Sequence, residues 1–245
     1  MSEKISRREF VVTGTAGLAA AAQAPTMITR RSVTPVVISS GNGHKYKNGG
    51  TVTCVEKAFA MMTSGADVLE SLVAGVNIVE LDPLDNSVGY GGLPNAEGVV
   101  QLDACCMHGP RKRAGGVGAL EGVKTPSLVA YKVMQETDHH LLVGKGAQDF
   151  ARTMGVDILP DLNTEGSRKA WLEWKRRSDP LHYLDPNKRE AELHRIMMEM
   201  VAEGYVNRNH IYGTINCNGV NASPLVVVTP QTSPLALTPL QLIVP

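Results

Sequence analysis

Short β-branched runs alternate with amphipathic helical patterns from residue 33 to residue 154, and this alternation limits the fold to one built from both strands and helices. The run VTPVVIS at 33–39 predicts a strand that ends in a turn. Apolar residues at three- and four-residue steps predict a helix ending at Gly65 and a second one with Asp67 as N-cap and Glu70 as its reciprocal capping partner. The remaining predicted elements are strands at 99–107, 115–120 and 140–143, and helices at 126–137 and 144–154.

The charge and aromatic content argue against a nucleic-acid partner. The 245 residues carry 24 basic and 24 acidic side chains, so the formal net charge is zero and no general attraction to polyanions is expected. Three Phe, six Tyr and two Trp are too few for a base-stacking platform. The basic run 111–113 stands alone and is interpreted as a solvated loop. With 43% apolar residues, the length suits one to two domains.

No cofactor and no metal are expected. Cys54, Cys105, Cys106 and Cys217 form no C-x-x-C pair and no Cys/His pair at zinc spacing, so they are predicted to be small buried thiols. The glycine-rich stretches at 115–118 and 144–146 both fail the dinucleotide fingerprint, and neither fits the Walker pattern. Nucleotide binding is therefore not expected.

Residues 1–24 are expected to be an export signal. The pair Arg7-Arg8, followed by Phe10, is typical of twin-arginine signals, and a weakly apolar stretch leads to the small-x-small pattern at 22–24. That stretch is too short and too poor in large apolar residues to span a membrane. The sequence therefore predicts a periplasmic or secreted protein with no membrane span.

The chain changes character at residues 159–209. Charged residues crowd together there, and Trp171 and Trp174 are spaced as one face of a helix. Two Asp-Pro pairs, at 179–180 and 185–186, predict a break before a further helix at about 188–204. A long exposed connection of this kind is usually either functional or disordered.

Beyond this connection, Gly213 leads into Thr214, which opens an apolar strand pattern. A Gly-Thr pair alone is common at strand starts, but the surrounding blocks are long and specific. They are DPLDNSVGYGGLPNAEGVVQLDACCMHG, GGVGALEGVKTPSLVAYKVMQETDHHLLVGKGAQDFA and GTINCNGVN. In this order, over roughly residues 33–222, they resemble the glycosylasparaginase/isoaspartyl peptidase family of N-terminal-nucleophile (Ntn) hydrolases. Many members have Asp where this chain has Gly213.

The resemblance implies an α/β fold of the Ntn-hydrolase type, a four-layer αββα sandwich made as a self-cleaving precursor. Thr214 is implied to be the catalytic residue, with cleavage between Gly213 and Thr214. The threonine hydroxyl attacks the carbonyl of Gly213, and water then splits the resulting ester. The freed α-amine, with an ordinary pKa of about 8, can act as base toward its own hydroxyl, which is otherwise a weak nucleophile.

The activity implied by the resemblance is an amidohydrolase cleaving the side-chain amide of asparagine-type substrates, such as N4-(β-N-acetylglucosaminyl)-L-asparagine or related β-aspartyl compounds. Its substrate-binding residues stay unassigned; the Asn42-Gly43 turn and the loop at 87–94 are weaker candidates for the pocket wall. Two alternatives remain open. One is a β-aspartyl peptidase or plain L-asparaginase; the other is an inert fragment or a non-enzymatic exported protein on the same scaffold.

The expected organisation is a signal at 1–24, the α-subunit part at 25–213, the start of the β-subunit at 214–221, and an aberrant tail at 222–245. The tail has no charged residue, no glycine and five prolines, a density that breaks both helix and sheet pairing. The family's later segments, which clamp the substrate carboxylate and form the oxyanion hole, do not appear. We therefore expect an incomplete fold that lacks most of the β-subunit, replaced after about Asn221 by a frameshift or faulty gene model. Uncovered apolar sheet surface and poor stability would follow, whereas a complete protein is expected to be a homo-oligomer.

Overall fold

The structure is a computed structural model, and it describes residues 34–179, 186–206, 208, 214–221 and 227–228. The predicted signal at 1–24, Gly213 and most of the predicted tail lie outside the described residues. All described residues belong to the unit that spans Val33–Pro245.

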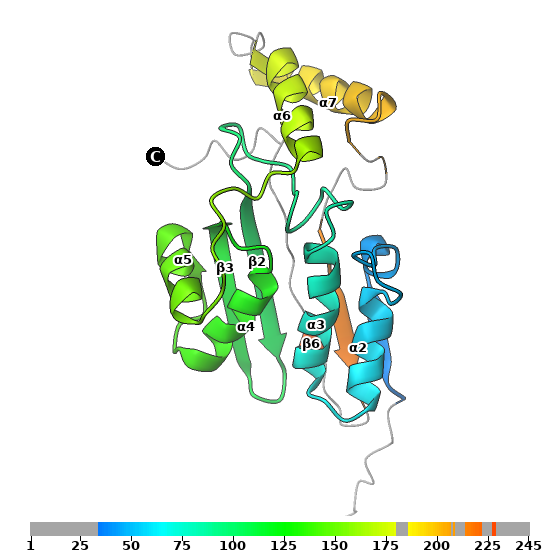
Figure 1. Cartoon of the computed structure of the whole chain (residues 1–245), viewed down its shortest axis with the longest axis vertical. Coiled ribbons are helices and arrows are strands. Elements are labelled where there is room, and N and C mark those ends of the chain that lie inside the picture. Colours follow the sequence, from blue (N-terminus) through cyan, green and yellow to red (C-terminus); the bar gives the residue numbers. More distant parts are fainter. Residues whose placement is uncertain (1–33, 180–185, 207, 209–213, 222–226, 229–245) are drawn as a thin grey trace, which may run out of the picture. The chain divides into compact units, whose positions relative to one another are not determined.

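Two three-stranded sheets run through this unit (Figure 1). The first sheet has the order β1-β5-β6, all antiparallel, with bounds Val36–Ser39, Cys217–Val220 and Val227–Val228. In the second sheet β2 (Gln101–His108) and β3 (Arg113–Glu121) form a hairpin, and β4 (Leu142–Val143) adds parallel to β3. Because β6 contacts β2, the two sheets meet at these strands.

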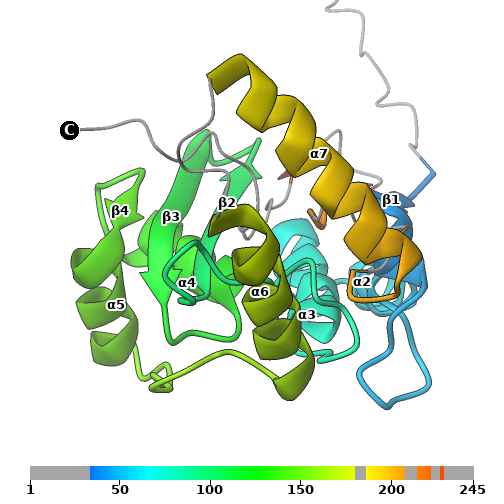
Figure 2. The same ribbon diagram turned by 90° about the horizontal axis from the view of Figure 1, so that it is seen from above.

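Four helices cover one face of the sheets (Figure 2). They are α2 (Cys54–Thr63), α3 (Val68–Glu80), α4 (Pro126–Glu136) and α5 (Gly144–Thr153). The helix α2 packs on β1, α3 on β5, α4 on β2 and β3, and α5 on β3 and β4. The strand and helix patterns of the sequence are thus confirmed at each of these positions, and so is the α/β class.

Capping residues determine where the first two helices begin, with one correction. The predicted reciprocal pair at Asp67 and Glu70 is only half formed, because Asp67 accepts from the Glu70 N–H at 3.1 Å while the Glu70 side chain is exposed. The other Asp67 oxygen bonds His108 Nε2 at 2.9 Å instead. The complete capping box is at Thr53 and Glu56, at the start of α2.

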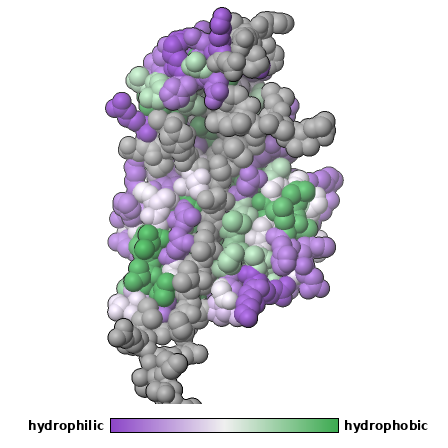
Figure 3. Space-filling view, turned by 180° about the vertical axis from the view of Figure 1, so that it is seen from behind, coloured by the Kyte–Doolittle hydropathy of each residue, from purple (hydrophilic) through white to green (hydrophobic). Residues whose placement is uncertain are grey.

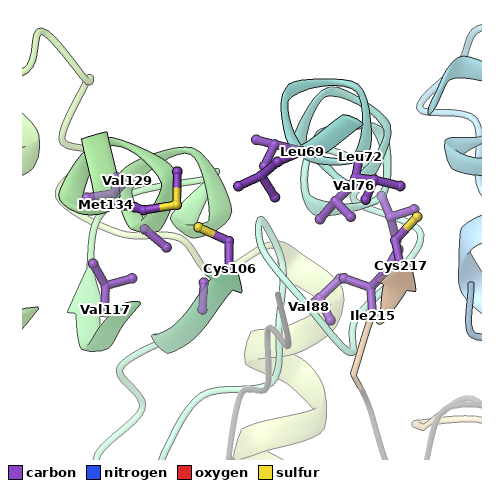
Figure 4. Close-up of a cluster of buried hydrophobic side chains, with 14 of the residues drawn as sticks. Leu69, Leu72, Val76, Val88, Cys106, Val117, Val129, Met134, Ile215 and Cys217 are labelled. Carbon is purple, nitrogen blue, oxygen red and sulfur yellow. The ribbon is translucent and has the colours of Figure 1, made fainter. Parts of the chain in front are cut away.

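The main core lies between the helix layer and the sheets (Figure 4). Its fully buried large side chains include Leu69, Leu72 and Val76 of α3, each contributing about 1.5–3 kcal/mol when buried. The glycine-rich pattern of β3 has a packing reason: a Cβ on Gly115 would lie 2.3 Å from the carbonyl oxygen of Ala130 in α4. Glycine there lets the strand approach the helix closely.

A second, smaller core belongs to α6 (Glu165–Ser178) and α7 (Pro186–Ala202), which pack against each other. Its buried members are Leu93, Ala170, Ile196, Met200, Val201 and Val206. Arg177 of α6 forms ion pairs with Glu173, Glu199 and Glu203 around this core. Because Leu93 is a member of this core, the two helices pack against the loop that contains it.

The face of the sheets opposite the helices carries exposed apolar side chains (Figure 3). Ile38 of β1 is 64% exposed, Val143 of β4 is 58% exposed, and Met107 of β2 is 51% exposed. Cys105 is exposed on this face too, so the prediction of four buried thiols is wrong for this one. Neighbouring residues of a strand point to opposite faces, which is why Cys106 is buried and Cys105 is not. Apart from α6 and α7, the described residues form one helix layer and one sheet layer. The four-layer sandwich stays a prediction.

Candidate functional site

Thr214 is half-buried and lies just before β5. Hydrogen bonds to its own carbonyl group, on the side toward Ile215, hold it in place. Its carbonyl oxygen accepts hydrogen bonds from Ser40 Oγ at 3.2 Å and from Asn42 Nδ2 at 3.4 Å. The next residue, Ile215, is fully buried in the main core, where it lies beside Val88 (Figure 4). The peptide that follows Thr214 is thus fixed by polar contacts on one side and by the core on the other.

The Asn42-Gly43 turn, predicted as a pocket wall, lies against Thr214 because of how β1 ends. Ser40 N donates to Asn216 O at 2.9 Å, and Asn216 N donates to Ser40 Oγ at 3.0 Å, so strand pairing continues past Ser39. The chain then closes into the 3-10 helix η1 (Gly41–His44). A Cβ on Gly43 would lie 2.6 Å from Ser39 Cβ, a contact that rotation of the serine side chain cannot relieve, so glycine suits this closure.

A fully buried carboxylate, Asp85, lies next to Asn42. One oxygen, Oδ2, accepts from Asn42 Nδ2 at 3.2 Å. The other, Oδ1, accepts from Ser87 N at 2.9 Å and from Ser87 Oγ at 2.5 Å. Asp85 and Ser40 were not among the candidates drawn from the sequence. The Asp-x-Ser spacing is a local signal for such a turn, but the contact with Asn42 spans 43 residues and has no local signal.

The loop at 87–94, the other predicted pocket wall, is shaped by a close approach to α3. Gly89 has φ +58°, and a Cβ there would lie 2.1 Å from the carbonyl oxygen of Glu80. That oxygen accepts from Tyr90 N at 2.7 Å. The two ends of the loop differ in their contacts: Ser87 joins Thr214 through Asp85 and Asn42, whereas Leu93 packs into the small core of α6 and α7.

The side chain of Glu80 is fully buried and links α3 to the amino end of α4. Its carboxylate accepts from Ser127 Oγ at 2.7 Å, from Ser127 N at 3.1 Å and from Asn77 Nδ2 at 2.7 Å. Burial raises the pKa of Glu80 to about 7, although these hydrogen bonds favour the charged form and oppose the rise. Glu80 therefore titrates near neutral pH.

Cys54 at the start of α2 and Cys217 of β5 are both fully buried, with their sulfur atoms 3.8 Å apart. The hydrogen bond with Cys217 and burial both raise the pKa of Cys54 far above its usual range. Cys54 is therefore a protonated, unreactive thiol at neutral pH. This pair joins the segment that begins at Thr214 to the helix layer.

The part of the chain that the structure describes contains no cluster of three or more His, Cys, Asp or Glu side chains placed to hold a metal ion. None of its helices is long and apolar enough to cross a membrane. A groove of about 610 Å³ lies elsewhere, between the 155–162 segment and α5, and shares no lining residue with the surroundings of Thr214.

Known proteins that are similar to this chain carry asparaginase in their names. The family model described as asparaginase matches residues 32–222. The chain is 38% identical over 144 residues to the N(4)-(beta-N-acetylglucosaminyl)-L-asparaginase of Elizabethkingia miricola, a match covering 59% of this chain and 40% of that protein. It is 42% identical over 109 residues to the plant-type L-asparaginase of Pyrococcus abyssi, covering 44% and 35%. It is 31% identical over 157 residues to the isoaspartyl peptidase/L-asparaginase of Xenopus laevis, covering 60% and 50%. The chain thus spans about a third to a half of the length of these relatives.

Proposed function

The chain belongs to the asparaginase family, and we propose that it is an amidohydrolase precursor in which Thr214 is the nucleophile. The observation that carries the proposal is the placement of Thr214 within the matched region. It lies just before β5, it is half-buried, and its carbonyl is held by Ser40 and Asn42. These contacts lie on the carboxyl side of Thr214, so they do not depend on an intact bond to Gly213.

In the first proposed step the chain cuts itself. The hydroxyl oxygen of Thr214 attacks the carbonyl carbon of Gly213, the peptide bond to the Thr214 nitrogen breaks, and the hydroxyl proton passes to that nitrogen. Water then hydrolyses the ester, which leaves a carboxylate on Gly213 and a free amine on Thr214. A free α-amine has an ordinary pKa of about 8, so a useful fraction is neutral and can act as base near pH 7.

In the second proposed step the freed threonine attacks a substrate. The α-amine takes the hydroxyl proton while the oxygen attacks the side-chain carbonyl of an asparagine-type substrate. The leaving amine departs with that proton, and water hydrolyses the β-aspartyl ester to release aspartate. Covalent catalysis of this kind splits one difficult hydrolysis into two easier steps.

The substrate class is an asparagine amide or a β-aspartyl compound, which includes N4-(β-N-acetylglucosaminyl)-L-asparagine. The relatives carry glycosylasparaginase, L-asparaginase and isoaspartyl peptidase names, so all three substrate types belong in the assay. Released N-acetylglucosamine, ammonia and amino acid distinguish them. For the complete protein we propose a homo-oligomer, which light scattering measures. The alternative function is a non-enzymatic protein on this scaffold.

Replacing Thr214 with alanine is expected to abolish self-cleavage. The wild-type chain should give two fragments whose masses add up to the chain plus one water molecule, whereas the variant has no hydroxyl to attack Gly213. Mass spectrometry of the purified proteins over several days measures both. Thr214→Ser retains a hydroxyl and is expected to cleave.

Two results would contradict this proposal. An intact wild-type chain under all conditions would support the non-enzymatic alternative. Cleavage at the same position in Thr214→Ala would mean that a contaminating protease cuts the chain.

Export through the twin-arginine pathway is proposed for the whole protein, with removal of residues 1–24. The motif residues Arg7 and Arg8 support it, although they lie outside the described residues. Changing both to lysine is expected to keep the protein in the bacterial cytoplasm, because the receptor reads the arginine pair. Fractionation followed by N-terminal mass analysis tests this, and an unchanged periplasmic yield of the double variant would refute it.

A further inference from the structure

We propose that Asp85 is a positioning residue for Thr214, acting through the side-chain amide of Asn42. This rests on the proposed function, because it concerns the residue assigned there as the nucleophile. In this role Asp85 orients Asn42, and Asn42 orients the carbonyl of Thr214.

The amide of Asn42 can take only one orientation in these surroundings. Its nitrogen lies 3.2 Å from Asp85 Oδ2 and 3.4 Å from the Thr214 carbonyl oxygen, two groups that can only accept. Its oxygen lies 2.7 Å from Ser40 Oγ, whose single hydroxyl proton is shared between this oxygen and the Thr214 carbonyl at 3.2 Å. A reversed amide would turn its oxygen toward both acceptors and lose both bonds, whereas Ser40 Oγ, a hydroxyl, can pair with either end of the amide. Asp85 and the Thr214 carbonyl therefore select the orientation that donates to Thr214.

Asp85 is itself held rigidly, so it can impose that orientation. The side chain is fully buried, and its second oxygen accepts two bonds from Ser87, at 2.9 Å from the backbone nitrogen and 2.5 Å from Oγ. Hydrogen bonds to an ionised acceptor are roughly twice as strong as neutral ones. Removing a donor from a buried carboxylate costs free energy, so the link to Asn42 is costly to break.

Holding the carbonyl of Thr214 controls where its hydroxyl points. The carbonyl defines the plane of the peptide to Ile215, which is anchored in the core, so the backbone of Thr214 is fixed from this side. A shift of about 1 Å at a reacting group can cost about a hundredfold in rate. Because the contacts lie on the carboxyl side, the same residues hold Thr214 before and after the bond to Gly213 is cut.

The test compares Asp85→Asn with Asp82→Asn. An asparagine at 85 must direct its amide nitrogen either at Asn42 Nδ2 or at the donors of Ser87, so one pair of donors faces each other in both orientations. Self-cleavage is expected to slow roughly tenfold to a hundredfold. Asp82 is the matched control, since it is 3% exposed in the same turn but accepts from Asn48 N at 2.7 Å and Leu84 N at 3.0 Å. Asp82→Asn is expected to cleave within about threefold of wild type.

A second readout separates placement from a loss of folding. In isotopically labelled protein, the carbonyl carbon resonance of Thr214 is expected to move in Asp85→Asn and in Asn42→Ala, and to stay in place in Asp82→Asn. Circular dichroism identifies variants that do not fold, and Asn42→Ala tests the same link if Asp85→Asn is among them. A resonance that stays in place in Asp85→Asn or Asn42→Ala overturns the proposal whatever the cleavage rate.

Failure of this proposal and failure of the proposed function give different results. If the wild-type chain cleaves and Asp85→Asn cleaves equally fast, or if Asp82→Asn is slowed as much, Asp85 is not a positioning residue. If the wild-type chain never cleaves, the proposed function fails, and the carbonyl resonance alone decides whether Asp85 places Thr214.

Discussion

Replacing Gly89 with alanine is expected to lower the free energy of unfolding by about 3–5 kcal/mol, from overpacking and backbone strain together. The new Cβ would lie 2.1 Å from the carbonyl oxygen of Glu80, and the residue has φ +58°, a conformation that side chains with a Cβ avoid. The clash is with backbone, so it cannot be relieved by rotating a flexible side chain. The loop must move away from α3, which also breaks the hydrogen bond from Tyr90 N to Glu80 O. Chemical unfolding followed by circular dichroism measures the change.

Gly144→Ala is the matched control for this substitution. Gly144 has φ +50°, close to the value at Gly89, but nothing lies within 4 Å of the position its Cβ would take. Only the backbone strain applies there, so the expected loss is about 1 kcal/mol. Equal losses in the two variants would mean that the contact with Glu80 does not matter. Because Asp85 and Ser87 lie just before Gly89 in the same loop, Gly89→Ala should also slow any self-cleavage.

The free energy of unfolding is expected to fall as the pH rises from about 4.5 to about 7, and Glu80 should account for about 3 kcal/mol of that fall. Burial raises the pKa of Glu80 from 4.5 to about 7. Between these values the folded state binds a proton that the unfolded state has released, so each increase in pH favours unfolding. Above about pH 7 both states are ionised, and the dependence ends. Asp67, whose pKa lies below its usual value of 3.8, titrates outside this window.

Urea unfolding of the wild-type protein and of Glu80→Gln at pH 5, 6, 7 and 8 isolates this contribution. Glutamine cannot titrate, so the stability difference between the two proteins should change by about 3 kcal/mol across the window in favour of the variant at high pH. Glutamine also presents donors to Ser127 and Asn77, a pH-independent cost that shifts the whole curve. A difference that stays constant with pH would show that Glu80 is not buried as described.

The elements of the fold could be predicted from the sequence because their signals are local. Periodic apolar residues identified α2 to α5, and β-branched or glycine-rich runs identified β1 to β4. Errors arose where a neighbour distant in sequence decides the outcome. Asp67 turns its second oxygen to His108, 41 residues away, and not to its own helix. The exposure of Cys105 was open to prediction, since two adjacent cysteines on a strand cannot both face the core.

The candidate site could be predicted only in part, because its contacts also join residues that are distant in the sequence. Thr214 was found through a family resemblance, and the turn at Asn42 through its glycine and asparagine. That Asn42 touches the carbonyl of Thr214 is a contact across 172 residues, which no spacing reveals. Asp85 looked like an ordinary turn residue, and its burial beside Asn42 comes from a contact across 43 residues.

The pairing of β1 with β5 has a consequence for the molecularity of folding. The four paired positions, Val36↔Val220 to Ser39↔Cys217, join strands that lie on opposite sides of the Gly213–Thr214 bond in the sequence. If that bond is cut as proposed, the sheet joins two polypeptides, and refolding becomes a second-order association governed by mass action. The thermal midpoint of the cut protein would then rise with its concentration, while that of the uncut chain would not. Dilution would weaken the cut form without any change in its contacts.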